Sequence, residues 1–271
     1  MYTLSNDSLS VSVLDPVADQ ERFGPRYCTG GYIFQVEDAR HGPLMSGPTY
    51  PHDFNWFDGQ GIPDAFNLGP LREPGDTGNT ALIIGIGECD LSQPSVLQFC
   101  EWQVVAQPEM ISMLTTQERG RYKLQLERTV RLSGRTIRSS TTLHNTGGLF
   151  IQLRWFPHPF YPHPEGDELC RLNFIAGMPA DSHYDLAPSG YIRRRNWPWN
   201  EGYFQALDHH AQSNLIILQK HPQLGLVAAT CSYIPAFFPI WGNPYTFSWE
   251  PYLERTIAAG QSLTWWIDYE F

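Results

Sequence analysis

The feature that most restricts the fold of this chain is its regular interruption by turn-forming residues. Gly occurs 23 times and Pro 22 times in 271 residues, and helical periodicity is hard to find between them. The intervening runs are short, rich in β-branched and aromatic residues, and bounded by Gly, Pro, Asn and Asp. The sequence therefore predicts an all-β fold with antiparallel strands and few short helices.

The clearest hairpin is predicted over residues 122–142. Apolar residues alternate with polar ones in its first half, a Ser-Gly pair at 133–134 makes the turn, and the return strand begins near Ile137. One face of this hairpin should be buried and the other wet. The apolar residues that alternate are Leu124, Leu126, Val130 and Leu132.

Further strands are predicted at 81–86, 96–105, 149–155, 214–220, 225–232 and 262–269. So many strands do not pair in one flat open sheet without curling or stacking. We therefore expect one large antiparallel β-sandwich domain over 1–271. Two segments, 41–76 and 157–199, are irregular and rich in Pro, Gly and aromatics, so we expect them to border a cleft.

Composition narrows the class of partner. Hydrophobic residues make up 42% of the chain and charged residues 17%, which is enough apolar material for a substantial core. The formal charge of −10 argues against nucleic acid or an anionic membrane as partner, since both require concentrated Lys and Arg. A neutral small molecule fits better. The one basic run, Arg193-Arg194-Arg195, would hold a phosphate or form a solvated loop.

The cysteines and the N-terminus indicate the compartment. Five cysteines with no CxxC pair give neither a complete disulfide framework nor a zinc knuckle, so we expect reduced, mostly buried thiols. The first residues lack the basic start and apolar run of a signal peptide, and no stretch is long enough to span a bilayer. We expect a cytoplasmic, soluble protein that is a monomer or homodimer.

A histidine and a glutamate, each set among aromatic residues, are the best candidates for chemistry. His158 lies in Trp-Phe-Pro-His-Pro-Phe-Tyr at 155–161, and Glu250 lies in Ser-Trp-Glu-Pro-Tyr at 248–252. Aromatic rings stack on the C–H faces of sugars and exclude water, while an imidazole and a carboxylate move protons. The pattern favours proton transfer on a carbohydrate. Glu254 is an alternative base, and a packed histidine without catalytic role is the alternative for His158.

Four landmarks in order resemble those of the aldose 1-epimerase, or galactose mutarotase-like, superfamily. The first is Arg-Phe-Gly-Pro-Arg-Tyr at 22–27 followed by Thr-Gly-Gly at 29–31, and the second is Asn-Thr-Gly at 145–147 followed by His-Pro-Phe-Tyr at 158–161. The third is Leu-Asp-His at 207–209, and the fourth is Glu250 followed by Glu-Arg-Thr-Ile-Ala-Ala-Gly-Gln at 254–261. Together they span most of the chain.

The resemblance implies an isomerase that interconverts the α and β anomers of a hexose or hexose phosphate by acid/base ring opening, with no cofactor and no metal. It implies that Glu250 is the base and His158 the acid. The substrate-binding candidates are Arg26, His52, Asp208, Trp155 and Trp241.

The chain also departs from the family pattern. A second histidine in a Leu-His-Gly-Gly context is missing, and His52 in Tyr-Pro-His-Asp is the nearest equivalent. The segments 60–69 and 85–88 are closer to a less characterised branch of the superfamily. A carbohydrate-binding protein that retains the cleft without the chemistry is therefore a second hypothesis, and a polysaccharide lyase or hydrolase a third.

Overall fold

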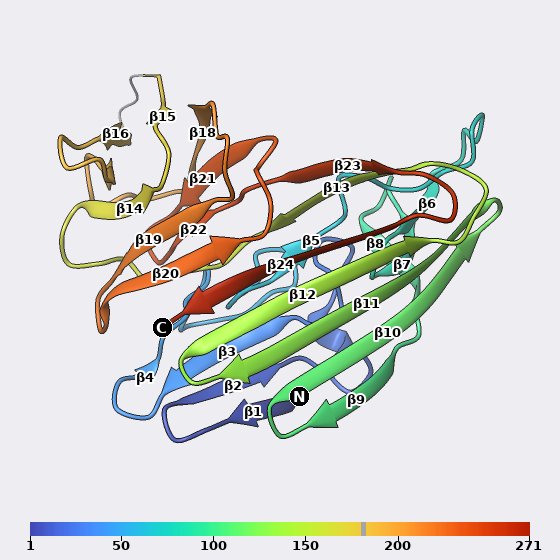
Figure 1. The fold of residues 1–271 in the computed structure, drawn as a ribbon, viewed down its shortest axis with the longest axis horizontal. Helices are drawn as coiled ribbons and strands as arrows, with labels where there is room; N and C mark the ends of the chain where they lie inside the picture. Colours follow the sequence, from blue (N-terminus) through green and yellow to red (C-terminus); the bar gives the residue numbers. More distant parts are fainter. Residues whose placement is uncertain (180–182) are drawn as a thin grey trace.

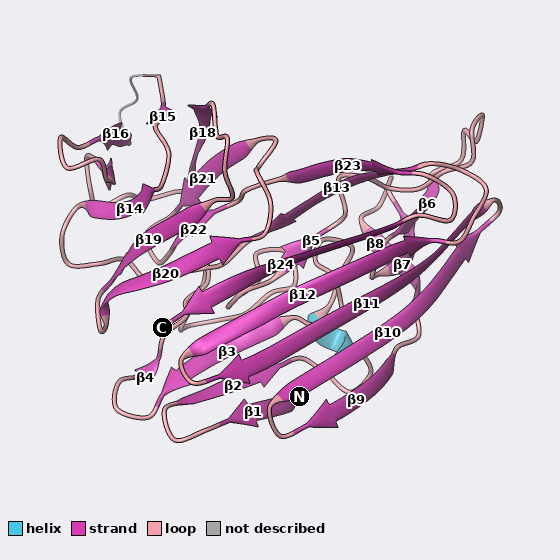
Figure 2. Ribbon diagram, viewed as in Figure 1, coloured by secondary structure: helices cyan, strands magenta, loops and turns pink. Residues whose placement is uncertain are grey.

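The computed structural model describes residues 1–179 and 183–271, and these residues are nearly all strand, turn and loop (Figures 1 and 2). The one helical element among them is a 3-10 turn, η1 (Gln20–Arg22). Every strand pairing is antiparallel. The all-β prediction is therefore confirmed.

A ten-stranded sheet forms the largest layer. Its order is β16-β17-β14-β19-β20-β24-β12-β11-β10-β9. In chain order its strands are β9 (Gln103–Gln107), β10 (Met110–Arg119), β11 (Tyr122–Ser133), β12 (Thr136–Asn145), β14 (Glu168–Leu172), β16 (Tyr184–Leu186), β17 (Ile192–Arg194), β19 (Ile216–His221), β20 (Gly225–Cys231) and β24 (Ser262–Glu270).

Four smaller sheets complete the described fold. An N-terminal sheet contains β1 (Tyr2–Ser5), β2 (Leu9–Val13), β3 (Ile33–Asp38) and β4 (Gly42–Pro43). A second, of order β15-β18-β21-β22, contains β15 (Ala176–Gly177), β18 (Tyr203–His209), β21 (Phe238–Gly242) and β22 (Phe247–Trp249). Two three-stranded sheets are β23-β13-β5 and β6-β7-β8, with β5 (Asp64–Ala65), β6 (Thr80–Ile83), β7 (Gly87–Asp90), β8 (Ser95–Phe99), β13 (Ile151–Pro157) and β23 (Leu253–Ile257).

The predicted central hairpin is formed by β11 and β12, whose register runs from Leu124↔Asn145 to Ser133↔Thr136. Its turn centres on Gly134, whose φ of +57° favours glycine. The alternating apolar residues of β11 are all buried and belong to the main core cluster, which also takes in residues of the N-terminal sheet. The alternation therefore identified the buried face of the large sheet, and the layers pack as a sandwich.

Two predicted strands are wrong in extent. The segment 96–105 is two strands, because β8 ends at Phe99 and β9 begins at Gln103 in a different sheet. Between them Trp102 is buried, and its indole N–H donates to the Thr29 hydroxyl at 2.8 Å. The segment 81–86 also ends early, because Gly85 has a φ of +73° that starts the turn into β7. An apolar run in the sequence does not by itself show where one strand ends and the next begins.

The five cysteines are free, and all but Cys100 are buried. The expectation of mostly buried thiols is confirmed. The described part of the chain contains no helix with the length and apolarity of a membrane span.

Candidate functional site

His158 is placed by the junction of two strands. It follows β13 directly, its backbone N–H donates to the Pro63 carbonyl at 2.8 Å, and Pro157 before it pairs with Asp64 of β5. Only 3% of the residue is exposed. Because both the backbone and the preceding proline are held, the imidazole has a fixed starting point.

Glu250 lies directly against this imidazole. It follows β22, its backbone N–H donates to the Pro239 carbonyl at 2.9 Å, and its Oε1 is 3.3 Å from His158 Nε2. Only 6% of Glu250 is exposed. The structure therefore brings the two predicted catalytic residues together in a buried acid/base pair.

The pair continues a cross-strand register. β13 and β23 pair antiparallel with Arg154 opposite Glu254 and Trp155 opposite Leu253. Extending that register by four residues places His158 opposite Glu250. Along the shared face the side chains form successive rungs, namely Arg154 with Glu254 at 3.0 Å, then the stacked rings of Phe156 and Tyr252 at 4.6 Å, then the pair itself. We call this row of side chains the rung face.

Ser248 is a site residue that the sequence analysis missed. Its fully buried hydroxyl lies 2.8 Å from His158 Nδ1. A hydroxyl donates to Nδ1 of a neutral imidazole and accepts from it when the imidazole is protonated, so it satisfies both states. The signal for Ser248 was its spacing of two from Glu250, since residues i and i+2 of an extended chain share a face.

Aromatic rings enclose the imidazole. Phe160 lies 4.4 Å from it between ring centroids, and Tyr27, Trp241 and Phe156 lie at 6.1, 6.1 and 6.2 Å. Such a shell removes water and lowers the local dielectric, which destabilises charge on any group inside it.

The shell shifts both proton affinities. Burial lowers the pKa of His158 well below its usual 6.5, and the positive charge of Arg26 lowers it further. Burial raises the pKa of Glu250 from 4.5 to about 7, with Arg26 opposing the rise. A carboxyl group and an imidazole in contact whose proton affinities are moved in these directions are typical of a proton-transfer site.

Arg26 is a half-buried cation whose charge lowers the pKa values of both His158 and Glu250. Its Nη1 donates to the Phe57 carbonyl at 2.5 Å, and its guanidinium lies over the rings of Tyr27 and Phe57 at 4.9 and 4.7 Å. Tyr27 in turn borders His158. The structure therefore brings Arg26 to the edge of the candidate site.

Trp241 and Trp155 have different positions. Trp241 is half-buried and opposes Ser248 across β21 and β22, which puts both side chains on the sheet face against His158. Trp155 is 3% exposed and packs edge-on against Trp265 and Tyr233 in the core. Its side chain lies on the opposite face of β13 from that of His158. It therefore cannot stack against a sugar in this site.

The other two binding candidates lie outside the immediate shell. His52 is exposed and its ring meets Tyr245 edge-on at 6.1 Å. Asp208 is exposed on β18. It shares a face of that strand with Phe204, which pairs with Trp241 across the sheet, but it lies four residues further along the strand than Phe204. No contact joins either residue to the acid/base pair in the described part of the chain.

The three arginines at 193–195 form ion pairs with carboxylates of the same chain. Arg193 and Arg195 both pair with Asp185, and Arg194 is buried with Asp167 and the carbonyls of Pro164 and Glu165 as partners. The run is therefore structural, and its use as a phosphate site loses its basis.

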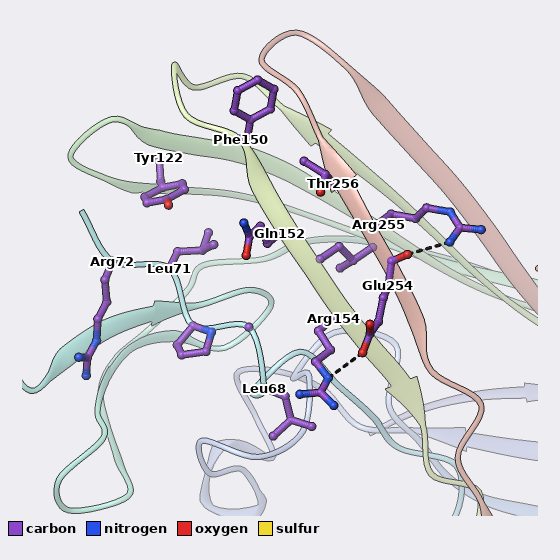
Figure 3. A pocket seen from close by; sticks show the side chains of 13 residues that line it. Leu68, Leu71, Arg72, Tyr122, Phe150, Gln152, Arg154, Glu254, Arg255 and Thr256 are labelled. Atoms are coloured by element: carbon purple, nitrogen blue, oxygen red, sulfur yellow. Dashed lines mark hydrogen bonds and ion pairs between the residues drawn. The ribbon is translucent and has the colours of Figure 1, made fainter. Parts of the chain in front are cut away.

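Glu254 also has a partner elsewhere. Its carboxylate pairs with Arg154, and both side chains border a groove of about 900 Å³ on the outer face of β13 and β23 (Figure 3). Among the two candidate bases, only Glu250 contacts the imidazole.

No metal cluster accompanies these residues. Among residues 1–179 and 183–271, no three side chains of His, Cys, Asp or Glu gather closely enough to hold an ion.

Comparison with known proteins identifies the fold. No protein-family model matches the chain, and no curated protein sequence matches it. Solved structures do match over nearly full length. A galactose mutarotase-like protein from Lactobacillus casei is 12% identical with a TM-score of 0.62, covering 100% of this chain and 99% of its own.

Two further structures agree. A candidate aldose 1-epimerase from Escherichia coli K12 is 17% identical with a TM-score of 0.61, covering 99% of this chain and 97% of its own. A GalM/aldose epimerase homologue from Caenorhabditis elegans is 12% identical with a TM-score of 0.53, covering 99% and 97%. The fold expected from the sequence is thereby confirmed: the chain has the galactose mutarotase-like sandwich.

Proposed function

We propose that this protein is an aldose 1-epimerase-like isomerase that interconverts the α and β anomers of a hexose. The observation that carries the proposal is the 3.3 Å contact between His158 Nε2 and Glu250 Oε1 inside a shell of aromatic rings. A general acid and a general base side by side match the two oxygens of a hemiacetal, because both oxygens are attached to the same carbon.

The chemistry needs two proton transfers. The Glu250 carboxylate takes the proton from the anomeric hydroxyl, the C1 to ring-oxygen bond breaks as C1 becomes an aldehyde, and protonated His158 gives its proton to the ring oxygen. Rotation about the C1–C2 bond then exposes the other face of the aldehyde. Closure reverses both transfers and restores the enzyme.

The reactive pair holds one shared proton. With the pKa of Glu250 near 7 and that of His158 lowered, the pair carries this proton between the two values. Moving it from the carboxyl to the imidazole leaves the net charge of the pair unchanged but separates charge inside the aromatic shell. It produces the carboxylate and imidazolium that the reaction uses. Ser248 Oγ accepts from Nδ1 in that state, so it stabilises the acid form.

Arg26 and Trp241 supply the substrate contacts in this proposal. Both are half-buried at the edge of the site, so we expect a ligand to approach the pair along their side chains. A guanidinium donates to ring hydroxyls, and an indole face packs on sugar C–H groups. Since Arg193 to Arg195 are engaged by carboxylates, we confine the proposal to unphosphorylated hexoses.

Polarimetry tests the proposal. Freshly dissolved α-glucose and α-galactose should relax to their anomeric equilibrium faster with protein than without. His158→Ala and Glu250→Gln should each lower the catalysed rate by about 10²–10⁴-fold, the usual contribution of a general acid or base. His41→Ala and Glu254→Gln are controls outside the pair. If the wild-type protein accelerates none of a panel of hexoses and pentoses, the proposal fails.

A second candidate function is binding of a carbohydrate without turnover. The low exposure of the pair, 3% for His158 and 6% for Glu250, favours it, because a substrate must reach both atoms. Polarimetry together with a binding titration of the same sugars separates the two. A sugar that binds saturably, with loss of binding in Trp241→Ala but no change in relaxation rate, establishes the binding protein.

A further inference from the structure

The groove of about 900 Å³ on the outer face of β13 and β23 has a polar floor built from one patch of the rung face. Cross-strand pairing sets Gln152 beside Thr256 and Arg154 beside Glu254, so an amide, a hydroxyl, a guanidinium and a carboxylate lie together. Figure 3 shows these side chains along the two strands, and Arg255, which also lines the groove, extends from the side of β23 away from Gln152.

The floor keeps much of its hydrogen-bonding capacity free. In the described residues, neither the Gln152 amide nor the Thr256 hydroxyl makes a side-chain hydrogen bond, and the Arg154–Glu254 pair at 3.0 Å is nearly half exposed. Such an exposed pair contributes little stability by itself. At the groove wall, Arg72 Nε is buried with no partner in the described structure. The exposed groups of Gln152, Thr256, Arg154 and Glu254 are therefore available to a ligand.

The ends of the groove carry apolar surface. Phe150, just before β13, is 64% exposed, and Leu68 is 44% exposed at the other end of the groove (Figure 3). Tyr122 is half-buried near the Phe150 end. Large exposed rings beside convergent polar groups are typical of ligand sites. Aromatic rings of this kind pack on the C–H faces of sugars.

The mixture of donors and acceptors selects the kind of ligand. A phosphate or carboxylate needs donors alone and would meet the Glu254 carboxylate. A sugar hydroxyl both donates and accepts, so pairs of hydroxyls match the mixed floor of guanidinium, carboxylate and amide. The volume exceeds what one hexose fills, which favours a short chain.

The groove is separate from the acid/base pair. Phe156 and Tyr252 form the rung between them, both under 7% exposed, with Arg154 over the Tyr252 ring at 5.2 Å on the groove side. This aromatic rung closes the rung face between the two places. A ligand in the groove therefore contacts neither His158 nor Glu250.

We propose that the groove is a second, non-catalytic site for a neutral oligosaccharide of two or three units. The choice of a saccharide rests on the proposed function, whereas the choice of an uncharged one rests on the groove itself. The protein would hold a glycan chain at one place and act on a reducing sugar at another.

Saturation-transfer NMR with maltotriose, cellotriose and the anionic trisaccharide trigalacturonate tests this proposal. A neutral trisaccharide should give saturable binding that falls at least tenfold in Phe150→Ala and in Gln152→Ala. Phe204→Ala and Gln125→Ala are matched controls, since they make the same changes at exposed positions outside the groove. Thermal unfolding of each variant checks that the fold is retained.

The outcomes separate the two proposals. Binding that persists in His158→Ala, together with loss in the groove variants, supports the second site whether or not the protein catalyses mutarotation. Binding of trigalacturonate alone, binding of neither neutral trisaccharide, or equal loss in the control variants would overturn it. Failure of polarimetry with intact groove binding removes only the isomerase.

Discussion

Replacing Glu250 by Gln should stabilise the protein, and more so at alkaline pH. The pKa of the buried Glu250 carboxyl is raised from 4.5 to about 7, so the folded state prefers the protonated form. A raised carboxyl pKa means that the stability present below pH 4.5 is lost as pH rises through 7. The full loss corresponds to about 3 kcal/mol. The amide of Gln has nearly the same shape and carries no charge to bury.

Thermal and urea unfolding at two pH values measure this effect. At pH 8.5, Glu250→Gln should exceed the wild type by about 3 kcal/mol, or roughly 5–10 °C in Tm. At pH 5 the difference should shrink to about 1 kcal/mol or less, because the wild-type carboxyl is then protonated in the fold. The lowered pKa of His158 reduces the free energy of unfolding at acid pH. Because this reduction is present in the wild type and in Glu250→Gln, it largely cancels in the difference between them.

Glu254→Gln is the matched control, because Glu254 is 43% exposed by side chain and paired with Arg154. It should show no gain at either pH. Equal stability of Glu250→Gln and wild type at pH 8.5 and pH 5 would refute the reasoning, since the Glu250 carboxylate would then be solvated in the folded protein.

Three more predictions concern Ser248, the pH dependence of the rate, and the packing around Gly24. Ser248→Ala leaves His158 Nδ1 buried without a partner, so kcat/KM for mutarotation should fall about 5–150-fold, equivalent to 1–3 kcal/mol, with Thr restoring part of the loss. The rate should also depend on pH with an alkaline limb near pH 7 and an acid limb well below 6.5, measured as kcat/KM from pH 4 to 9; a flat profile would contradict a shared proton. Gly24→Ala places a methyl 2.1 Å from Trp56 Cε3 and should cost about 1–3 kcal/mol by urea unfolding, whereas Gly148→Ala, with nothing within 4 Å, should not.

The strands that sequence predicted well are those with one wet face. β11 alternates apolar and polar residues over its whole length, and the structure buries the apolar ones. The prediction of one strand over residues 96–105 was wrong because an apolar run has no alternation that marks where a strand ends. In the break between the two strands, the buried Trp102 bonds to Thr29, which is distant in the chain.

The candidate site was only partly predictable for a related reason. Aromatic neighbours made His158 and Glu250 conspicuous, and the resemblance supplied their roles, but their contact depends on the pairing of two distant strands. Trp155 shows the limit. It stands three residues before His158, yet strand alternation turns it to the opposite side of β13, where it packs with Trp265. Knowing the strand register would have separated the two.

The register of β13 and β23 has a consequence for how this protein tolerates change. One inserted residue anywhere between Leu253 and Glu250, or between Trp155 and His158, would turn one member of the proposed acid/base pair toward the opposite side of its strand. The fold could survive such an indel while proton exchange vanished. If the pair carries the proposed function, length variation among natural homologues should concentrate outside these two short stretches.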